Sequence, residues 1–154
     1  MPDTQTLQRF RNPFPTTDLI IEYNDGRREG IVLIERRNPP LGLALPGGFA
    51  EYGLSLEDNA LKEAKEETNL EVILENPGHP LCVRSSPDRD PRAHMISIAY
   101  VGRGYGQLCA GDDAKRAHLY TFDQARQLVE KEALVFDHTE ILKEYFAYRG
   151  MPYG

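Results

Sequence analysis

Three glutamates, Glu63, Glu66 and Glu67, have residue types and a spacing that could do chemistry. On a helix each residue advances by about 100°, so the three carboxylates fall within an arc of roughly 100° on one face. Like charges at i,i+3 and i,i+4 repel each other, and a bound divalent cation would reverse that effect. Magnesium prefers oxygen ligands and commonly joins carboxylates to substrate phosphates. The cluster therefore predicts a magnesium site and a phosphorylated substrate, with a merely solvated acidic face as the alternative.

A helix must position these glutamates, and the flanking residues predict one that runs to about Thr68. Ser55 is a favourable N-cap, and Asn69 suits the left-handed residue that often ends a helix. Small and apolar residues define the neighbouring buried side of this helix: Ala60, Leu61, Ala64 and Thr68. The glutamates are thus expected at the edge of the core.

Strands and helices alternate along the rest of the chain, which indicates an α/β fold. Strands are predicted at 18–23, 28–36, 41–45, 81–84 and 95–102, and helices at 122–131 and 137–149. Asn24-Asp25-Gly26 predicts a hairpin turn, and Pro46-Gly47-Gly48 is expected to stop the third strand. Residues 85–92 are expected to form a polar hairpin loop, and residues 102–106 a flexible turn.

Composition narrows the class of protein. The chain has 154 residues, with 40% hydrophobic and 27% charged residues, which predicts one compact domain spanning residues 1–154. The formal charge of −6 disfavours nucleic acid as a partner. Residues 1–11 contain no apolar run, so we expect no signal peptide, no membrane anchor and a cytoplasmic location. Cys82 and Cys109 are expected to be reduced thiols.

The stretch from Gly48 to Leu70 resembles the Nudix box, G-x5-E-x7-R-E-U-x-E-E-x-G-U, in which U is aliphatic. The spacing is kept throughout, and six positions match the pattern: Gly48, Glu63, Ala64, Glu66, Glu67 and Leu70. Three positions depart from it: Leu54 replaces the first glutamate, Lys62 the arginine and Asn69 the late glycine. The resemblance implies a Nudix-type α/β/α sandwich with a mixed β-sheet.

The resemblance also implies roles for residues of the box. Glu66 and Glu67 would bind Mg²⁺, with Mn²⁺ able to substitute, and the Gly48 carbonyl could also ligate. Glu63 would bind the metal or take a proton from the attacking water. Lys62 keeps the positive charge that helps to orient a glutamate in the family, but it lacks the planar fork of arginine. The changes at Leu54 and Lys62 therefore predict reduced turnover.

Other segments, which lie wholly or mostly outside the box, resemble Nudix proteins of the ADP-ribose pyrophosphatase subgroup: residues 36–49, 86–94, 111–114 and 136–138. This resemblance implies a small nucleotide substrate, ADP-ribose, hydrolysed to AMP and ribose 5-phosphate. Two alternatives stay open. One is a catalytically weak Nudix domain that binds such a nucleotide as a sensor, and the other is hydrolysis of a nucleoside triphosphate. Many relatives dimerise, so a homodimer is also considered.

Arg89 and Arg92 are candidates for gripping a diphosphate or a terminal ribose phosphate, because guanidinium forks fit planar anion edges. The alternative is that these arginines pair within their own loop, with Asp88 or Asp90.

Three further residues are weaker candidates. His94 could touch substrate or be a hydrogen-bonded structural residue. Phe49 could stack on a base or cover the core. Asp113, or its neighbour Asp112, could supply the missing carboxylate or form a simple turn.

Overall fold

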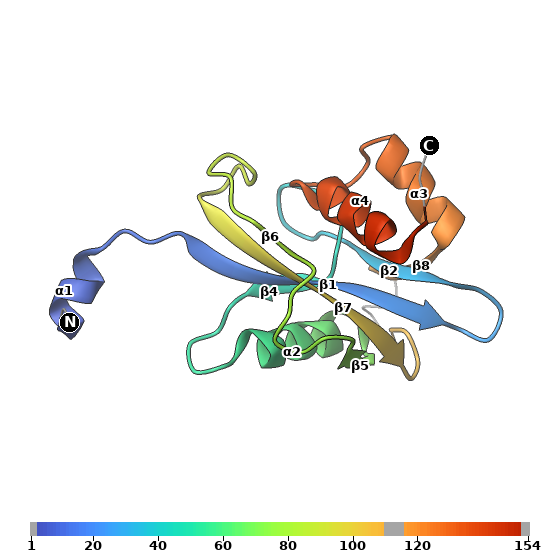
Figure 1. Ribbon diagram of the computed structural model, residues 1–154, viewed down its shortest axis with the longest axis horizontal. Helices are drawn as coiled ribbons and strands as arrows, with labels where there is room; N and C mark the ends of the chain where they lie inside the picture. Colours follow the sequence, from blue (N-terminus) through green and yellow to red (C-terminus); the bar gives the residue numbers. More distant parts are fainter. Residues whose placement is uncertain (1–2, 110–115, 152–154) are drawn as a thin grey trace.

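The computed structural model describes residues 3–109 and 116–151, and its centre in that part of the chain is a mixed sheet of eight strands (Figure 1). The strands are β1 (Phe14–Asn24), β2 (Glu29–Glu35), β3 (Leu43–Ala44), β4 (Gly47–Phe49), β5 (Glu71–Leu74), β6 (Cys82–Arg84), β7 (Met95–Tyr105) and β8 (Ala117–Thr121). The helices are α1 (Thr4–Arg9), α2 (Leu56–Thr68), α3 (Phe122–Glu130) and α4 (His138–Arg149).

The two longest strands, β1 and β7, form the middle of the sheet. They run parallel in a register that pairs Phe14 with Met95 and Glu22 with Arg103. The other strand pairs are antiparallel, including the predicted hairpins of β1 with β2 and of β6 with β7. Parallel strands need a long crossover connection, and here that connection carries α2. The mixed sheet predicted by the resemblance is therefore confirmed.

Helices cover both faces of this sheet, with α2 on one side and α3 and α4 on the other (Figure 1). Successive side chains of a strand point to opposite faces, so Leu19 and Ile21 pack on the α2 side while Ile20 packs beneath α4. The buried stripe predicted for α4 is confirmed: Ile141, Leu142, Tyr145 and Phe146 are fully buried. The α/β/α sandwich is thus confirmed. Helix α1 lies apart from this body and buries no residue (Figure 1).

Residues 102–105 correct one prediction, because they continue β7 instead of forming a flexible turn. They pair with β5, which the sequence analysis did not predict. A Cβ at Gly104 would lie 2.8 Å from Leu70 Cδ1, and one at Gly102 would lie 2.6 Å from Val72 Cγ1. These glycines therefore allow neighbouring segments to approach closely, which is a common reason for glycine in a strand.

The predicted end of the third strand before Pro46-Gly47-Gly48 is confirmed, because β3 ends at Ala44, but the two glycines also begin a strand that was not predicted. Gly47 and Gly48 lie in β4 and pair with Asp18 and Thr17 of β1. The short elements α1 and β8 were not predicted either. None of the described helices is long and apolar enough to cross a membrane.

Helix α2 has the ends that the sequence predicts. The Ser55 hydroxyl accepts a hydrogen bond from the Asp58 N–H at 3.0 Å, and Asn69 ends the helix with a left-handed φ of 67°. Asn59 and Ala64 lie on its buried side. These caps fix the helix register and so the direction in which the glutamates point.

An ion-pair cluster ties the loop between β6 and β7 to the start of α4. Asp137 accepts hydrogen bonds from Arg84 Nε at 3.1 Å and from Arg89 Nη2 at 2.6 Å. Burial alone would raise the pKa of Asp137, but the two guanidinium groups outweigh this effect and lower it. The Arg89 side chain is only 3% exposed, so its charge depends on this partner.

We expect Asp137→Asn to lower the free energy of unfolding by roughly 2–4 kcal/mol, because it leaves the buried Arg89 charge without its counterion. Chemical denaturation would measure the change. Asp88→Asn is the matched control, since Asp88 is an exposed aspartate in the same loop. An equal effect of both substitutions would contradict the importance of the Asp137 cluster.

Candidate active site

Glu67 is a half-buried carboxylate beside the glycine pair. Its Oε2 accepts a hydrogen bond from the Gly47 N–H at 3.3 Å. Burial, followed by the charge of Glu63, raises the pKa of Glu67 to about 8. An ionised carboxylate is costly here, because two acids share a partly dehydrated space. The position therefore favours either a proton or a cation.

Glu63 lies one helical turn before Glu67 and rests directly on the backbone of Gly48. A Cβ added at Gly48 would lie 2.6 Å from Glu63 Cδ and within 2.8 Å of both carboxylate oxygens. Burial and the charge of Glu66 raise the pKa of Glu63. Glycine is thus required at position 48 if the carboxylate is to occupy this place.

Glu66 is the exposed member of the three glutamates. Its carboxylate lies 2.9 Å from the ammonium of Lys62, which also lies 3.1 Å from the carboxylate of Glu51. The structure thus places the three carboxylates along one face of α2, as predicted, and it gives each a different neighbour.

A buried pair beneath the glycines holds β4 in position. The Leu45 N–H donates to His138 Nδ1 at 3.0 Å, and Nε2 of the same ring lies 3.6 Å from Asp18 Oδ1. Burial lowers the pKa of His138. Because Nδ1 accepts the Leu45 N–H, the ring proton belongs on Nε2, on the side of Asp18. Ser97 also donates to Asp18. The sequence analysis did not identify this pair, because Asp18 and His138 are 120 residues apart and neither belongs to the box.

Arginines and glutamates line one cleft. One part of the cleft, about 320 Å³, is lined by Arg36, Arg37, Arg116, Glu66 and Glu67. A narrower part, about 80 Å³, continues past the glycines, and both parts share Arg36 and Glu67. The cleft therefore combines acidic side chains that suit a cation with guanidinium groups that suit phosphate.

Arg36 and Arg92 stack on the same aromatic ring. Their guanidinium carbons lie 4.9 and 5.1 Å from the centroid of Phe136. Burial, and then the charge of Arg92, lowers the pKa of Arg36. Two cations held this close favour an anion between or beside them. Arg36 and Arg116 were not singled out as site residues, although Arg36 begins a segment that resembles the ADP-ribose pyrophosphatase subgroup and directly follows an apolar strand.

The two arginines predicted for substrate binding have different surroundings. Arg89 is buried against Asp137, and its guanidinium is engaged there. Arg92 pairs within its loop, with Nη2 2.7 Å from Asp90 Oδ2, which is the alternative considered for it. Its side chain is still 36% exposed, and it lines the narrower part of the cleft.

The weaker candidates for substrate binding also differ in their surroundings. His94 Nε2 lies 2.9 Å from the Ser85 carbonyl oxygen, so the ring makes a local structural contact. Phe49 is half exposed, lines the cleft beside Gly48 and lies 5.6 Å beneath the Arg92 guanidinium. Asp112 and Asp113 lie outside the described residues.

Comparison with known proteins identifies the family that this site represents. Residues 13–145 match the NUDIX domain. The chain belongs to the Nudix family. Over 150 residues it is 38% identical to an ADP-ribose pyrophosphatase of Methanocaldococcus jannaschii, covering 96% of this chain and 81% of that protein. It is thus a Nudix pyrophosphohydrolase of the kind represented by ADP-ribose pyrophosphatases.

Solved structures of Nudix proteins share the fold of this chain. A MutT/nudix family protein from Enterococcus faecalis is 31% identical and has a TM-score of 0.70; 91% of this chain is covered, and the chain spans 63% of that protein. The NUDIX domain of Shewanella oneidensis NrtR, in complex with ADP ribose, has a TM-score of 0.72 at 20% identity, with 96% and 99% of the two chains covered. That second likeness concerns the fold alone.

Nudix hydrolases generally need a divalent metal, and the donor set fits one. Within residues 3–109 and 116–151, no three or more acidic, His or Cys side chains are grouped closely enough to hold an ion by themselves. Glu63 and Glu67 nevertheless flank the Gly47–Gly48 backbone and repel each other. One or two carboxylates are what Mg²⁺ commonly takes from a protein, with water and substrate phosphate completing its shell.

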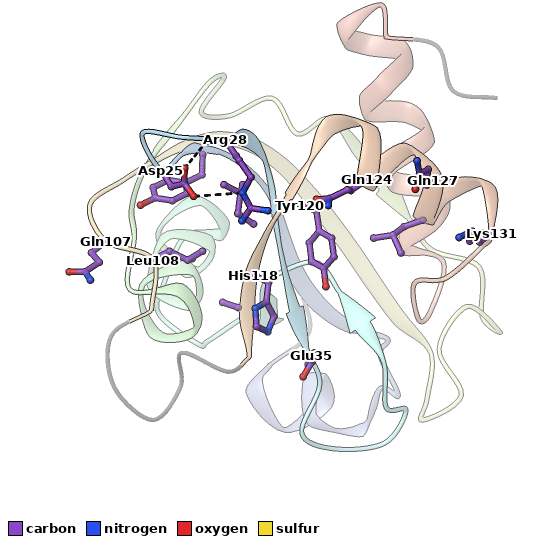
Figure 2. Close-up of a pocket in the computed structure, with 14 residues that line it drawn as sticks. Asp25, Arg28, Glu35, Gln107, Leu108, His118, Tyr120, Gln124, Gln127 and Lys131 are labelled. Atoms are coloured by element: carbon purple, nitrogen blue, oxygen red, sulfur yellow. Dashed lines mark hydrogen bonds and ion pairs between the residues drawn. The ribbon is translucent and has the colours of Figure 1, made fainter.

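A larger hollow lies elsewhere on this Nudix domain. It measures about 910 Å³ and is lined by side chains of β2, β8 and α3, including His118, Tyr120 and Gln124 (Figure 2). None of the α2 glutamates lines it, and its Asp25 is paired with Arg28 (Figure 2). Size alone would select this hollow, but the chemistry selects the cleft at the Nudix box.

We expect Gly48→Ala to weaken Mn²⁺ binding by about tenfold or more, because its Cβ would displace the Glu63 carboxylate. The melting temperature should change little, since the displaced atoms are the end of a flexible side chain. Calorimetric titration with Mn²⁺ would measure the affinity. In a Glu63→Ala background, Gly48→Ala should not weaken Mn²⁺ binding further. If Gly48→Ala weakens Mn²⁺ binding as much in that background as in the wild type, the geometry described here is wrong.

Proposed function

We propose that this Nudix protein hydrolyses ADP-ribose to AMP and ribose 5-phosphate with Mg²⁺, and that Mn²⁺ can substitute. One water molecule is consumed, and one P–O bond of the diphosphate bridge is broken. The water oxygen becomes part of one product phosphate, and the bridging oxygen leaves with the other. Family membership assigns a pyrophosphohydrolase activity, and the particular substrate, ADP-ribose, is what we propose.

The observation that carries the proposal is the pairing of acid and arginine in one cleft. Glu66 and Glu67 line the same space as Arg36, Arg37 and Arg116. A diphosphate bound to a cation carries both charges that this arrangement complements. The resemblance of the chain to an archaeal ADP-ribose pyrophosphatase over most of its length supports ADP-ribose as the particular diphosphate.

Acidic and basic residues have different roles in the proposed reaction. Glu66 and Glu67, with the Gly48 carbonyl, would hold the cation, and Glu63 would join them or act on the attacking water. A bound Mg²⁺ would supply neutralisation of the diphosphate and so make phosphorus more open to attack. Arg36 and Arg92 would bind the phosphate oxygens from the opposite side. Glu63 is the candidate to accept a proton from the attacking water if it does not ligate.

Phe49 and Phe136 would support the arginines in this proposal. Both rings lie against the Arg92 guanidinium, at 5.6 and 5.1 Å from their centroids. Stacking limits the rotation of a guanidinium and leaves its N–H edges free for oxygen atoms. Arg89 would act indirectly, by fixing the loop that carries Arg92 through its pair with Asp137.

Glu67→Gln should reduce kcat for ADP-ribose by at least about a hundredfold, because it removes a cation ligand. The melting temperature should not fall, because burial and Glu63 already disfavour the ionised form of Glu67 and the amide is neutral. Product identification by chromatography would test both the bond cleaved and the substrate. Glu71→Gln is the control, because Glu71 is an exposed glutamate paired with Lys65 outside the cleft.

A chelator should abolish the wild-type reaction, and added Mg²⁺ or Mn²⁺ should restore it. Saturable binding of ADP-ribose without turnover would instead favour the sensor function. Pyrophosphate release from a nucleoside triphosphate, without cleavage of ADP-ribose, would favour a nucleoside triphosphate pyrophosphohydrolase.

Arg36→Ala should raise the KM for ADP-ribose by roughly tenfold to a hundredfold, because a charge-assisted hydrogen bond to phosphate is lost. Steady-state kinetics at saturating Mg²⁺ would measure it. Arg27→Ala, in the exposed turn between β1 and β2, should leave the KM unchanged. Equal KM values for Arg36→Ala and Arg27→Ala would exclude Arg36 from phosphate binding.

A further inference from the structure

The missing glutamate of the Nudix box leaves a specific gap in this chain. Leu54 stands where the pattern has a carboxylate, and its side chain is 38% exposed in the loop before α2. We propose that Glu51, three residues earlier, replaces that carboxylate and acts through Lys62 as a positioning residue for Glu66. This inference rests on the proposed cation-dependent function of the same site.

The contacts of Lys62 carry the proposal. Its ammonium lies 3.1 Å from Glu51 Oε2 and 2.9 Å from Glu66 Oε1, so one cation bridges the loop and the helix. The three side chains are 41–55% exposed. Ion pairs this exposed add little to stability, so removal of Glu51 can be tested without unfolding the protein.

The position of Glu51 is set by a buried residue of α2. The Glu51 N–H donates to Asn59 Oδ1 at 3.0 Å, and Asn59 Nδ2 donates to Thr17 Oγ1 at 2.8 Å. Asn59 is completely buried, so this link is held by both α2 and β1. The Leu54 N–H donates to the Glu51 carbonyl oxygen at 3.1 Å, which closes the loop into a turn between the two positions.

Lysine needs such a second partner more than arginine would. Its ammonium is a point charge on a flexible stem, whereas a guanidinium orients a carboxylate through a planar fork. With one acceptor, Lys62 could swing across the helix face and neutralise the acids that the cation requires. With Glu51 on its other side, the ammonium is held between two carboxylates, and Glu66 keeps a defined position.

The test compares Mn²⁺ affinity, kcat and melting temperature in single and double variants. We expect Glu51→Gln to weaken Mn²⁺ binding by about tenfold, as for other groups that orient metal ligands, and to lower kcat. If Glu51 already supplies the missing carboxylate, Leu54 by itself does not reduce turnover as the box pattern predicts, so Leu54→Glu should change little in the wild type. It should restore most of the loss in the Glu51→Gln background. The melting temperatures of all variants should stay close to that of the wild type.

Glu71→Gln is the matched control. The exposed Glu71 carboxylate lies 3.0 Å from the ammonium of Lys65, another lysine of α2, and does not belong to the cluster. If Glu51→Gln and Glu71→Gln have the same Mn²⁺ affinity and kcat, Glu51 is only a surface charge and the proposal is wrong. Failure of Leu54→Glu to rescue Glu51→Gln would also overturn the claim that Glu51 replaces the missing carboxylate.

The Mn²⁺ readout separates this inference from the proposed substrate. Suppose that the wild type binds Mn²⁺, that Glu67→Gln does not, and that ADP-ribose is not cleaved. The substrate assignment then fails, but the effect of Glu51→Gln on Mn²⁺ affinity still decides the role of Glu51. If Glu67→Gln binds Mn²⁺ as well as the wild type, the proposed ion site itself is wrong, and the inference about Glu51 falls with it.

Discussion

The backbone at Gly47 and Gly48 passes so close to its neighbours that neither residue has room for a Cβ atom. At Gly48 the obstacle is the Glu63 carboxylate, and at Gly47 it is the Thr17 carbonyl oxygen, 2.2 Å from where a Cβ would lie. This close approach brings two acidic side chains of α2 against a strand that carries no side chains of its own there. The pairing of β4 with β1 and the proposed cation site both depend on it.

That constraint also explains why the surroundings are polar although they are buried. Asp18 and His138 lie under the glycines, where they hydrogen-bond to Ser97 and to the Leu45 backbone. A buried polar group is costly unless it is hydrogen-bonded, so these contacts must be made together. The result is a rigid floor for the cleft, and rigidity matters because a ligand carboxylate that shifts by a small distance loses its cation.

Charge is separated across the cleft by the fold. The acids come from a single helix, whereas Arg36 follows β2 and Arg92 comes from the loop before β7. Each group is held by its own partners, such as the Pro40 carbonyl oxygen for Arg36 and Asp90 for Arg92. These partners keep the arginines from pairing directly with the glutamates. The arginines can therefore bind a phosphate, while the glutamates can bind its cation.

The sequence by itself determined the local features. The spacing of Glu63, Glu66 and Glu67, the caps of α2 and the apolar stripe of α4 follow from helix geometry, and all of these lie within single segments. Only the tertiary structure decided which distant groups meet: the parallel register of β1 and β7, the strand formed by residues 102–105, and the arrival of Arg36 and Arg116 opposite Glu67. It also decided that Arg89 is engaged by Asp137. The physical reason is that helix periodicity and capping act over a few residues, whereas sheet register and charge pairing depend on how the whole core packs.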